Sequence, residues 1–307
     1  MKLITYDAGG GPHVGALESG EVVDLGFDGD MVAFIEAGAP VSRRTRVGQA
    51  RLLAPLRPRS MRDFLSFEGH LHNALSRLGR PIPSEWFDVP AYYKGMPDTV
   101  IGPEEEIPWP AYTSKLDYEL ELAAISGRRG KNIAKEGALS YVFGYTIWND
   151  MSARDVQTRE LPISMGPAKA KDWDGSNVFG PCIVTADELD PGNLRMTVRI
   201  NGEVRGEDNS GHMYHTIAVM ISYAAQAQTL YPGEVFGSGT AAGEAAIEIT
   251  YLRGRQKRSD AQGLRRRSRR SGRIAWRCRG PGRACRAPFA GGCIASATPM
   301  RRRVDWR

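Results

Sequence analysis

The sequence predicts an α+β fold that is predominantly β, because strand-like segments are short and numerous while helical patterns are few. The clearest hairpin signal is Asn201-Gly202, which joins strand-like residues 194–200 to residues 203–205. Helical patterns are restricted to residues 31–37, 61–79, 134–140 and 210–227 and to a turn that begins at Ser152. With 307 residues, of which 41% are hydrophobic, the chain can bury the core of one large domain with an appendage, or of two domains.

Residues 1–57 predict a small N-terminal β subdomain. Strand-like segments at Lys2–Tyr6, His13–Leu17 and Gly20–Asp24 are separated by glycine-containing turns, and a short helix follows at Met31–Ala37. We find no pattern of catalytic or ligand-binding residues in this segment.

The most informative stretch contains two closely spaced carboxylates. Glu119 and Glu121 alternate with Leu120 and Leu122, so on a strand both carboxylates project from one face while the leucines enter a core. Two such carboxylates repel each other unless a positive charge lies between them. A divalent cation resolves this conflict.

A third carboxylate, Asp150, follows the strand-like residues 145–148 and completes a candidate ligand set with Glu119 and Glu121. Three carboxylates without Cys or His nearby form a hard, all-oxygen site that suits Mg²⁺, Mn²⁺ or Ca²⁺. The alternative interpretation is a solvated edge strand on which Glu121 pairs with Arg128 or Lys131.

Further polar residues follow at spacings that suit a binding site. Arg154 and Gln157 come four and seven residues after Asp150, so they share a face with it if a helix begins at Ser152. An Arg can fork onto a substrate carboxylate, and a Gln amide both donates and accepts; the same residues can equally cap and brace the turn. The loop that ends at Thr240 offers amides and a hydroxyl to a carboxylate.

The charge of the chain is divided unevenly. Residues 251–307 contain 17 Arg and one Lys against Asp260 and Asp305, so this segment carries +16 and residues 1–250 carry −10. The pI near 9.2 therefore belongs to the C-terminal segment, and residues 1–250 are expected to behave as an ordinary acidic, soluble protein. Cys182 is the single cysteine of residues 1–250, which fits the cytoplasm, and neither a secretory signal nor a membrane span is predicted.

Several ordered motifs together resemble the fumarylacetoacetate hydrolase family. These are Glu-x-Glu-Leu-Ala at 119–123, Gly-Tyr-Thr-x-x-Asn-Asp-x-Ser-Ala-Arg-Asp-x-Gln at 144–157, Lys-Asp-Trp-Asp at 171–174 before Gly-Pro, and Pro-Gly-Glu-Val leading into Gly-Ser-Gly-Thr at 232–240. The resemblance extends from about residue 58 to residue 242.

The resemblance implies that residues 58–250 form the catalytic domain, a mixed β-sandwich roll flanked by helices, and that the protein is a homodimer. The implied activity is metal-dependent hydrolysis of a carbon–carbon bond in a β-diketo acid of the acylpyruvate, fumarylpyruvate or fumarylacetoacetate type, in the catabolism of aromatic compounds. Mg²⁺ is the expected cation, with Mn²⁺ or Ca²⁺ as alternatives. Hydration, dehydration or isomerisation-decarboxylation of 2-oxo acids stays an alternative, because these reactions share one metal-stabilised enolate.

The same resemblance assigns catalytic roles to residues that spacing alone does not single out. His70 is the implied general base that activates water, and Glu68 or Asp63 is expected to polarise it. Lys171 is the implied cation that faces the oxyanion of the substrate. Tyr92 is expected to place an aromatic ring beside the substrate.

The Arg-rich residues 251–307 lack apolar periodicity and cannot form a core. We expect this segment to be disordered or to result from out-of-frame translation of a GC-rich gene, because the composition changes where the family pattern stops. Two interpretations of the protein as something other than an active enzyme remain. It could be a nucleic-acid-binding protein on a disabled enzyme scaffold, or an inactive truncated product. Despite the basic segment, nucleic acid is not the expected partner.

Overall fold

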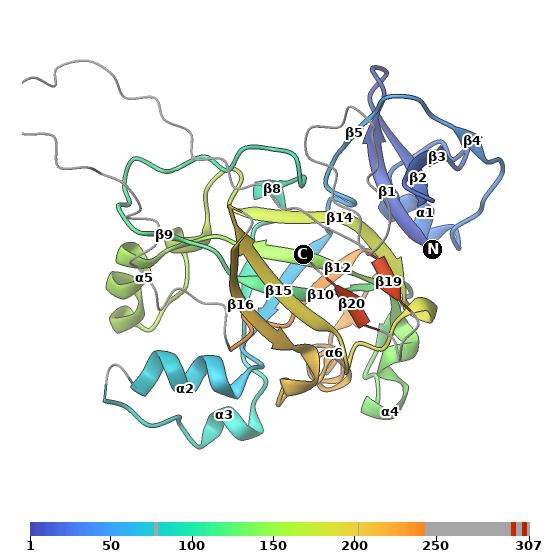
Figure 1. The fold of residues 1–307 in the computed structure, drawn as a ribbon. Helices are drawn as coiled ribbons and strands as arrows, with labels where there is room; N and C mark the ends of the chain where they lie inside the picture. Colours follow the sequence, from blue (N-terminus) through green and yellow to red (C-terminus); the bar gives the residue numbers. More distant parts are fainter. Residues whose placement is uncertain (77–78, 202, 243–295, 299–302, 306–307) are drawn as a thin grey trace, which may run out of the picture.

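The computed structural model describes residues 1–76, 79–201, 203–242, 296–298 and 303–305. The fold is α+β and predominantly β, as predicted, and it is built on one large mixed sheet (Figure 1). The strands of this main sheet are β1 (Lys2–Asp7), β2 (Pro12–Glu18), β3 (Glu21–Asp24), β4 (Thr45–Arg46), β5 (Arg51–Leu52), β6 (Ser60–Phe64), β7 (Tyr92–Gly95), β8 (Val100–Ile101), β10 (Leu120–Ser126), β12 (Val142–Asp150), β14 (Asn177–Thr185) and β18 (Glu234–Gly237).

The strands of the main sheet follow the order β4-β3-β2-β1-β14-β12-β10-β18-β6-β7. Most neighbours are antiparallel, whereas β18 pairs with β6 and β14 pairs with β8 in parallel. The remaining strands form two-stranded pairs: β9 (Leu116–Asp117) with β13 (Ser152–Ala153), β11 (Gly130–Lys131) with β17 (Thr229–Leu230), β15 (Arg195–Ile200) with β16 (Glu203–Asn209), and β19 (Ser296–Thr298) with β20 (Arg303–Asp305).

Short helices flank the sheet, with α2 and α3 on one side of the molecule and α4 on another (Figure 1). The α-helices are α1 (Met31–Glu36), α2 (Glu68–Ser76), α3 (Glu85–Asp88), α4 (Lys135–Ala138), α5 (Arg154–Glu160) and α6 (Ile217–Ala224). The 3₁₀ turns are η1 (Pro97–Thr99), η2 (Leu139–Tyr141), η3 (Leu161–Ile163), η4 (Lys169–Lys171), η5 (Ala186–Glu188) and η6 (Ser210–His212).

The strands and the helix predicted in residues 1–57 are confirmed as β1, β2, β3 and α1. They are continuous with the rest of the fold, because β1 pairs with β14 and places Lys2 opposite Val184. The boundary of a separate subdomain at residue 57 stays a prediction.

Alternation along β10 divides the core between the two faces of the main sheet. Leu120 and Leu122 lie in one apolar cluster with residues of β15 and α6. Ala123 lies in a second cluster with residues of β1, α1 and β14. Glu119 and Glu121 continue the row of Ala123, so the predicted alternation is confirmed. Their face is covered, however, and Glu121 is 1% exposed, which excludes a solvated edge strand.

Two predicted helices are shorter than expected. The prediction of one helix over 61–79 is wrong at its start. Residues 61–64 belong to β6, which lies between β18 and β7, and α2 follows. The helix over 210–227 is divided into η6 and α6. The amide of Tyr214 donates to the carbonyl of Ser66 at 2.8 Å and fixes the turn between them.

Of the segment 251–307, the structure describes β19 and β20, and the predicted character of the remainder lies outside the described residues. β20 lies beside β15 (Figure 1). Within the described chain, no helix has the length and apolar character needed to cross a membrane.

One glycine fixes the loop that carries Thr240. Gly239 has φ +75°, and a Cβ there would overlap the carbonyl oxygen of Phe64.

We expect Gly239→Ala to lower the free energy of unfolding by about 2 to 4 kcal/mol. In Gly137→Ala on α4 the Cβ would meet nothing within 4 Å, so this control should be neutral or stabilising by up to about 1 kcal/mol. Urea unfolding compares the two variants, and equal stabilities would contradict the described loop.

Candidate metal centre and active site

Two strand ends and a third strand bring four carboxylates to one end of the main sheet. Glu119 precedes β10 and Glu121 lies within it, Asp150 ends β12, and Asp63 lies on β6. The amide of Asp150 donates to the carbonyl of Glu119 at 3.0 Å, which fixes the two strands in register at this end. Glu121, Asp150 and Asp63 each lie two residues from a member of the second apolar cluster, so all three project from the same face.

Asp63, Glu121 and Asp150 form a compact acidic cluster. One carboxylate oxygen from each lies within 4.8 Å of the others, and all three residues are buried. When ionised, both oxygens of Glu121 and Oδ1 of Asp150 meet no hydrogen-bond donor among the described residues. Buried carboxylate oxygens require a cation or a proton, and an all-oxygen set suits a hard divalent ion. The residues present therefore fit a divalent cation.

Burial and mutual repulsion change the acidity of this cluster. Burial, and then the charge of Asp150, raise the pKa of Asp63 to about 7. Burial raises the pKa of Asp150 to about 6, although Lys171 opposes the shift. Burial and the charge of Asp63 raise the pKa of Glu121 well above its usual value. A proton shared between Glu121 and Asp63 therefore relieves the repulsion when no cation is bound.

Glu119, in contrast, is held by two cations. Its Oε1 lies 2.5 Å from Nη2 of Arg154, and its Oε2 lies 2.5 Å from Nζ of Lys171. Lys171 also donates to Oδ2 of Asp150. Burial alone would raise the pKa of Glu119, but Arg154 and Lys171 hold it well below its usual range. Burial disfavours the charged form of Lys171, but Asp150 and Glu119 raise its pKa, so the lysine stays charged at neutral pH.

The contacts of Arg154 match the alternative in which it braces the turn. Its Nε donates to Oδ2 of Asp117 at 2.7 Å, its Nη1 donates to Oε1 of Gln157 at 2.8 Å, and its Nη2 pairs with Glu119. The guanidinium therefore orients Glu119 and does not present a free fork to a substrate. Gln157 lies one turn further along α5, as predicted, and lines the pocket. Asp117 continues the alternation of Glu119 and Glu121, and this spacing is the sequence signal that indicates a third carboxylate beside them.

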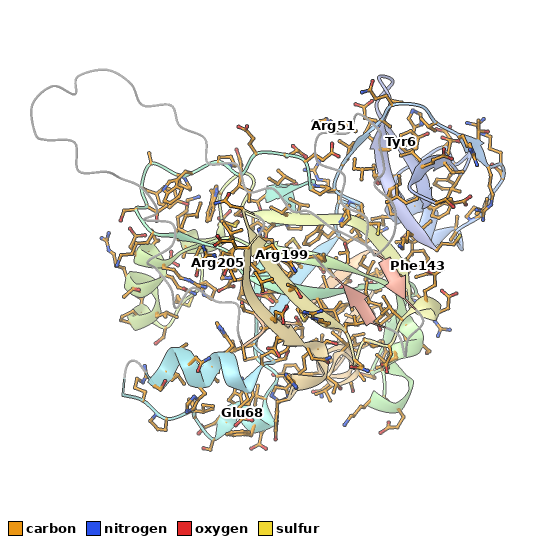
Figure 2. The ribbon with its side chains drawn as sticks, in the orientation of Figure 1. Tyr6, Arg51, Glu68, Phe143, Arg199 and Arg205 are labelled. Carbon is orange, nitrogen blue, oxygen red and sulfur yellow. The ribbon has the colours of Figure 1, made fainter. Side chains whose placement is uncertain are left out.

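His70 lies on α2 and lines the same pocket, but its predicted partners do not reach it. Its Nδ1 is buried and makes no hydrogen bond with the described residues. Glu68 is exposed at the edge formed by α2 and α3 (Figure 2), and Asp63 accepts from the amide of Gly239 at 3.1 Å within the acidic cluster. The structure therefore brings neither Glu68 nor Asp63 into hydrogen-bond contact with His70, and the residue that polarises His70 stays a prediction. Burial lowers the pKa of His70 to about 4, so the ring is neutral at neutral pH.

Tyr93, which follows the predicted substrate-binding Tyr92, contacts the acidic cluster. On β7, Tyr93 lies opposite Asp63 and Tyr92 lies opposite Phe64, so the two rings point to opposite faces. The hydroxyl of Tyr93 donates to Oδ2 of Asp150 at 2.7 Å. Tyr92 packs against Phe64, with ring centroids 4.8 Å apart, and lines another part of the pocket. The aromatic pair was visible in the sequence, but the register of β7 decides which ring reaches the centre.

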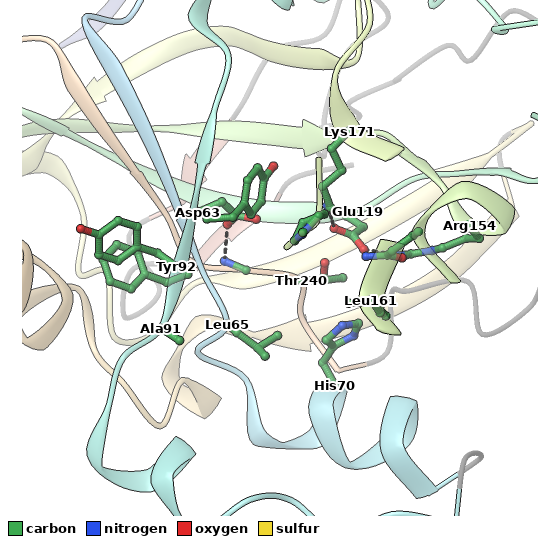
Figure 3. Close-up of a pocket in the computed structure, with 16 residues that line it drawn as sticks. Asp63, Leu65, His70, Ala91, Tyr92, Glu119, Arg154, Leu161, Lys171 and Thr240 are labelled. Carbon is green, nitrogen blue, oxygen red and sulfur yellow. Dashed lines mark hydrogen bonds and ion pairs between the residues drawn. The ribbon is translucent and has the colours of Figure 1, made fainter. Parts of the chain in front are cut away.

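The pocket has a volume of about 320 Å³ and gathers most of the predicted site residues (Figure 3). Thr240 is buried and lies between Glu119 and His70, where its hydroxyl can meet a substrate carboxylate. Glu121 and Asp150 lie beneath the pocket wall, and Glu68 lies outside it. The predicted residues that line the pocket are Asp63, His70, Tyr92, Glu119, Arg154, Gln157, Lys171 and Thr240.

Comparisons with known proteins identify relatives of this chain. The family described as "Fumarylacetoacetate (FAA) hydrolase C-terminal" matches residues 60–269, which extends past the predicted end of the resemblance at residue 242. The mitochondrial oxaloacetate tautomerase of Bos taurus is 32% identical over 274 residues, and the match covers 79% of this chain and 82% of that protein.

Solved structures share the fold. Fumarylacetoacetate hydrolase from psychrophilic Exiguobacterium antarcticum matches with a TM-score of 0.68 and 29% identity over 79% of this chain and 87% of that chain. A 5-carboxymethyl-2-hydroxymuconate delta-isomerase from Mycobacterium smegmatis matches with a TM-score of 0.62 and 25% identity over 79% and 89% of the two chains. By their names, these three relatives are a tautomerase, a hydrolase and an isomerase. The chain belongs to the fumarylacetoacetate hydrolase family.

Proposed function

We propose that this protein is a metal-dependent hydrolase that cleaves a carbon–carbon bond in a β-diketo acid of the acylpyruvate type. The observation that carries this proposal is the buried acidic cluster, whose ionised oxygens lack donors, in contact with the pocket that contains Lys171 and His70. Membership of an enzyme family supports a catalytic role.

A divalent cation, with Mg²⁺ preferred over Mn²⁺ or Ca²⁺, would be held by Glu121 and Asp150 together with Glu119 or Asp63, and would supply Lewis-acid polarisation of the 2-oxo acid. Lys171 keeps a fixed positive charge beside that position, because its Nζ pairs with both Glu119 and Asp150. The ammonium group can donate to the substrate oxygen that becomes negative as the carbon–carbon bond breaks.

His70 supplies the proton transfer in this scheme. Its neutral ring takes a proton from water, and the water oxygen bonds to the carbonyl carbon distal to the 2-oxo acid. The carbon–carbon bond then breaks, and its electron pair moves to the 2-oxo acid fragment. The proton on His70 is delivered to that fragment, so one carboxylic acid and one 2-oxo acid leave. Thr240 and the adjacent amides bind the carboxylate of the 2-oxo acid.

Tautomerisation of oxaloacetate, or another isomerisation or decarboxylation of a 2-oxo acid, is the second candidate. Nδ1 of His70 has no described acceptor, and the low pKa makes the ring a weak base for activating water. These alternative reactions need enolate stabilisation by Lys171 but no attack by water. A relative with 32% identity is an oxaloacetate tautomerase.

The homodimer, the cytoplasmic location and the part in catabolism of aromatic compounds stay predictions that rest on the family resemblance. Nucleic-acid binding by residues 251–307 is not part of the proposal.

The metal centre predicts opposite effects of one substitution on metal binding and on stability. Glu121→Gln should weaken Mg²⁺ or Mn²⁺ binding at least about a hundredfold, because it removes a charged ligand. The same change should raise the unfolding free energy of the metal-free protein at pH 8 by about 1 kcal/mol or more, because folding at that pH requires the buried Glu121 carboxyl either to stay charged against Asp63 or to take up a proton. Calorimetry and thermal melting measure the two effects. Glu136→Gln on exposed α4 is the matched control and should change neither.

The raised pKa values of the acidic cluster also predict that stability and metal binding depend on pH. The pKa values of Asp63 and Asp150 are raised from 3.8 to about 7 and about 6, so protonation favours the metal-free fold. Stability from these groups is complete below about pH 4 and is lost as pH rises through 6 to 7. Metal binding should strengthen over the same interval, because ligands must lose protons. Melting curves with Mg²⁺ and with chelator, from pH 5 to 8, should therefore diverge as pH rises; a constant difference would argue against this centre.

The role of His70 predicts a substrate-dependent defect. His70→Ala should reduce acylpyruvate hydrolysis by about two to four orders of magnitude while metal binding persists, because a general base acts in the transition state. Decarboxylation of oxaloacetate should be reduced far less, since it needs no water attack. His72→Ala on the same helix is the matched control. Equal losses on both substrates would contradict water activation by His70, and unchanged hydrolysis would favour the second candidate.

The position of Lys171 beside the acidic cluster predicts that its removal affects both substrate binding and turnover. Lys171→Met should impair both substrate binding and turnover, because the ammonium group meets the oxo acid in the ground state and its enolate afterwards. Lys135→Met, on the exposed surface of α4, should have no effect. Steady-state kinetics on either substrate separates the two parameters, and a normal KM in Lys171→Met would restrict its role to turnover.

A further inference from the structure

One side of the pocket is apolar. Leu65, Ala91 and Tyr92 line the side away from Arg154 (Figure 3). The amide of Leu65 donates to the carbonyl of Ala91 at 3.2 Å, so β6 and β7 continue side by side into this wall. Leu161 and Pro167 add apolar surface elsewhere in the lining.

The positive groups of the pocket are already engaged. Of the described residues that line it, only Arg154, Lys171 and His70 have side chains that can carry a positive charge. Arg154 pairs with Asp117 and Glu119, and Lys171 pairs with Glu119 and Asp150. None of these three side chains lies among Leu65, Ala91 and Tyr92 (Figure 3).

The local charge balance is negative even with a metal bound. In the described chain, the two permanent cations Arg154 and Lys171 stand against five carboxylates, so the sum is −3 when all are ionised and −1 with a divalent cation. The five are Asp63, Asp117, Glu119, Glu121 and Asp150. A substrate brings one carboxylate to the centre itself. A second carboxylate on the apolar side would meet no counter-charge and would be repelled by this negative balance, which disfavours its binding.

We propose that this pocket selects 2-oxo acids with one carboxylate and an uncharged apolar tail, and discriminates against those with a second carboxylate at the far end. The inference rests on the proposed function, since it places the 2-oxo acid head at the metal centre. The tail then lies against Leu65 and Ala91, where burial of its methylene groups favours binding.

Two stable compounds of equal length test the selection without turnover. 2-Oxohexanoate and 2-oxoadipate share six carbons and the same head, and differ in ending with a methyl group or a carboxylate. Calorimetry with the Mn²⁺-loaded full-length protein should show 2-oxohexanoate binding at least about tenfold more tightly. Equal affinity, tighter binding of 2-oxoadipate, or binding of neither compound would each overturn the proposal.

A charge added to the apolar wall should reverse the selection. Ala91 is exposed, so Ala91→Arg and Ala91→Lys can supply the missing cation without disturbing the core. Either should reduce the preference for 2-oxohexanoate at least about tenfold, chiefly by tighter binding of 2-oxoadipate. Leu139→Arg is the matched control, because Leu139 is 44% exposed and does not line the pocket. An unchanged ratio in both Ala91 variants would overturn the placement of the tail.

Binding and hydrolysis measured together separate the proposed selectivity from the proposed hydrolase activity. Selective binding of 2-oxohexanoate without hydrolysis of any acylpyruvate would reject the hydrolase assignment and keep the selectivity. Hydrolysis of acylpyruvates with neutral and carboxylate-terminated tails at equal kcat/KM would keep the hydrolase assignment and reject the selectivity.

Discussion

Repulsion among buried carboxylates is the constraint on which the rest of this site depends. In the described chain, five of them lie at one end of the main sheet, almost removed from water: Asp63, Asp117, Glu119, Glu121 and Asp150. Such a group is stable only where cations or protons offset its charge. Arg154 and Lys171 both act on Glu119, so the uncompensated charge is concentrated at Glu121, which is where a divalent ion fits.

Each carboxylate is fixed by a different part of the fold. The amide of Gly239 holds Asp63, and Tyr93 and Lys171 share one oxygen of Asp150, which leaves its other oxygen without a donor. Asp117 holds Arg154, which in turn holds Glu119. Because these contacts come from strands and from short turns packed on them, the fold itself fixes the positions of the carboxylates.

Local alternation predicts that Glu119 and Glu121 share one face, because period-two spacing determines which side chains project together. Asp150 follows from its place at the end of the next strand-like segment, and the role of the three carboxylates as metal ligands stays a prediction. Residues 61–64 were mistaken for helix because their apolar spacing also fits a helix, and the parallel pairing of β6 with β18 has no local signal. For the same reason, the presence of Asp63 in the acidic cluster and the contact of Tyr93 with Asp150 depend on register between distant strands.

The order of the strands also constrains how the protein can assemble. β1 pairs with β14, where Lys2 meets Val184, and β6 pairs with β18, where Asp63 meets Gly237. Contacts between such distant parts of a chain form slowly and late, and during synthesis they must wait until the second strand has left the ribosome. A nascent chain that stopped before β18 would contain every carboxylate of the centre but would lack the strand that joins β6, which carries Asp63, to β10.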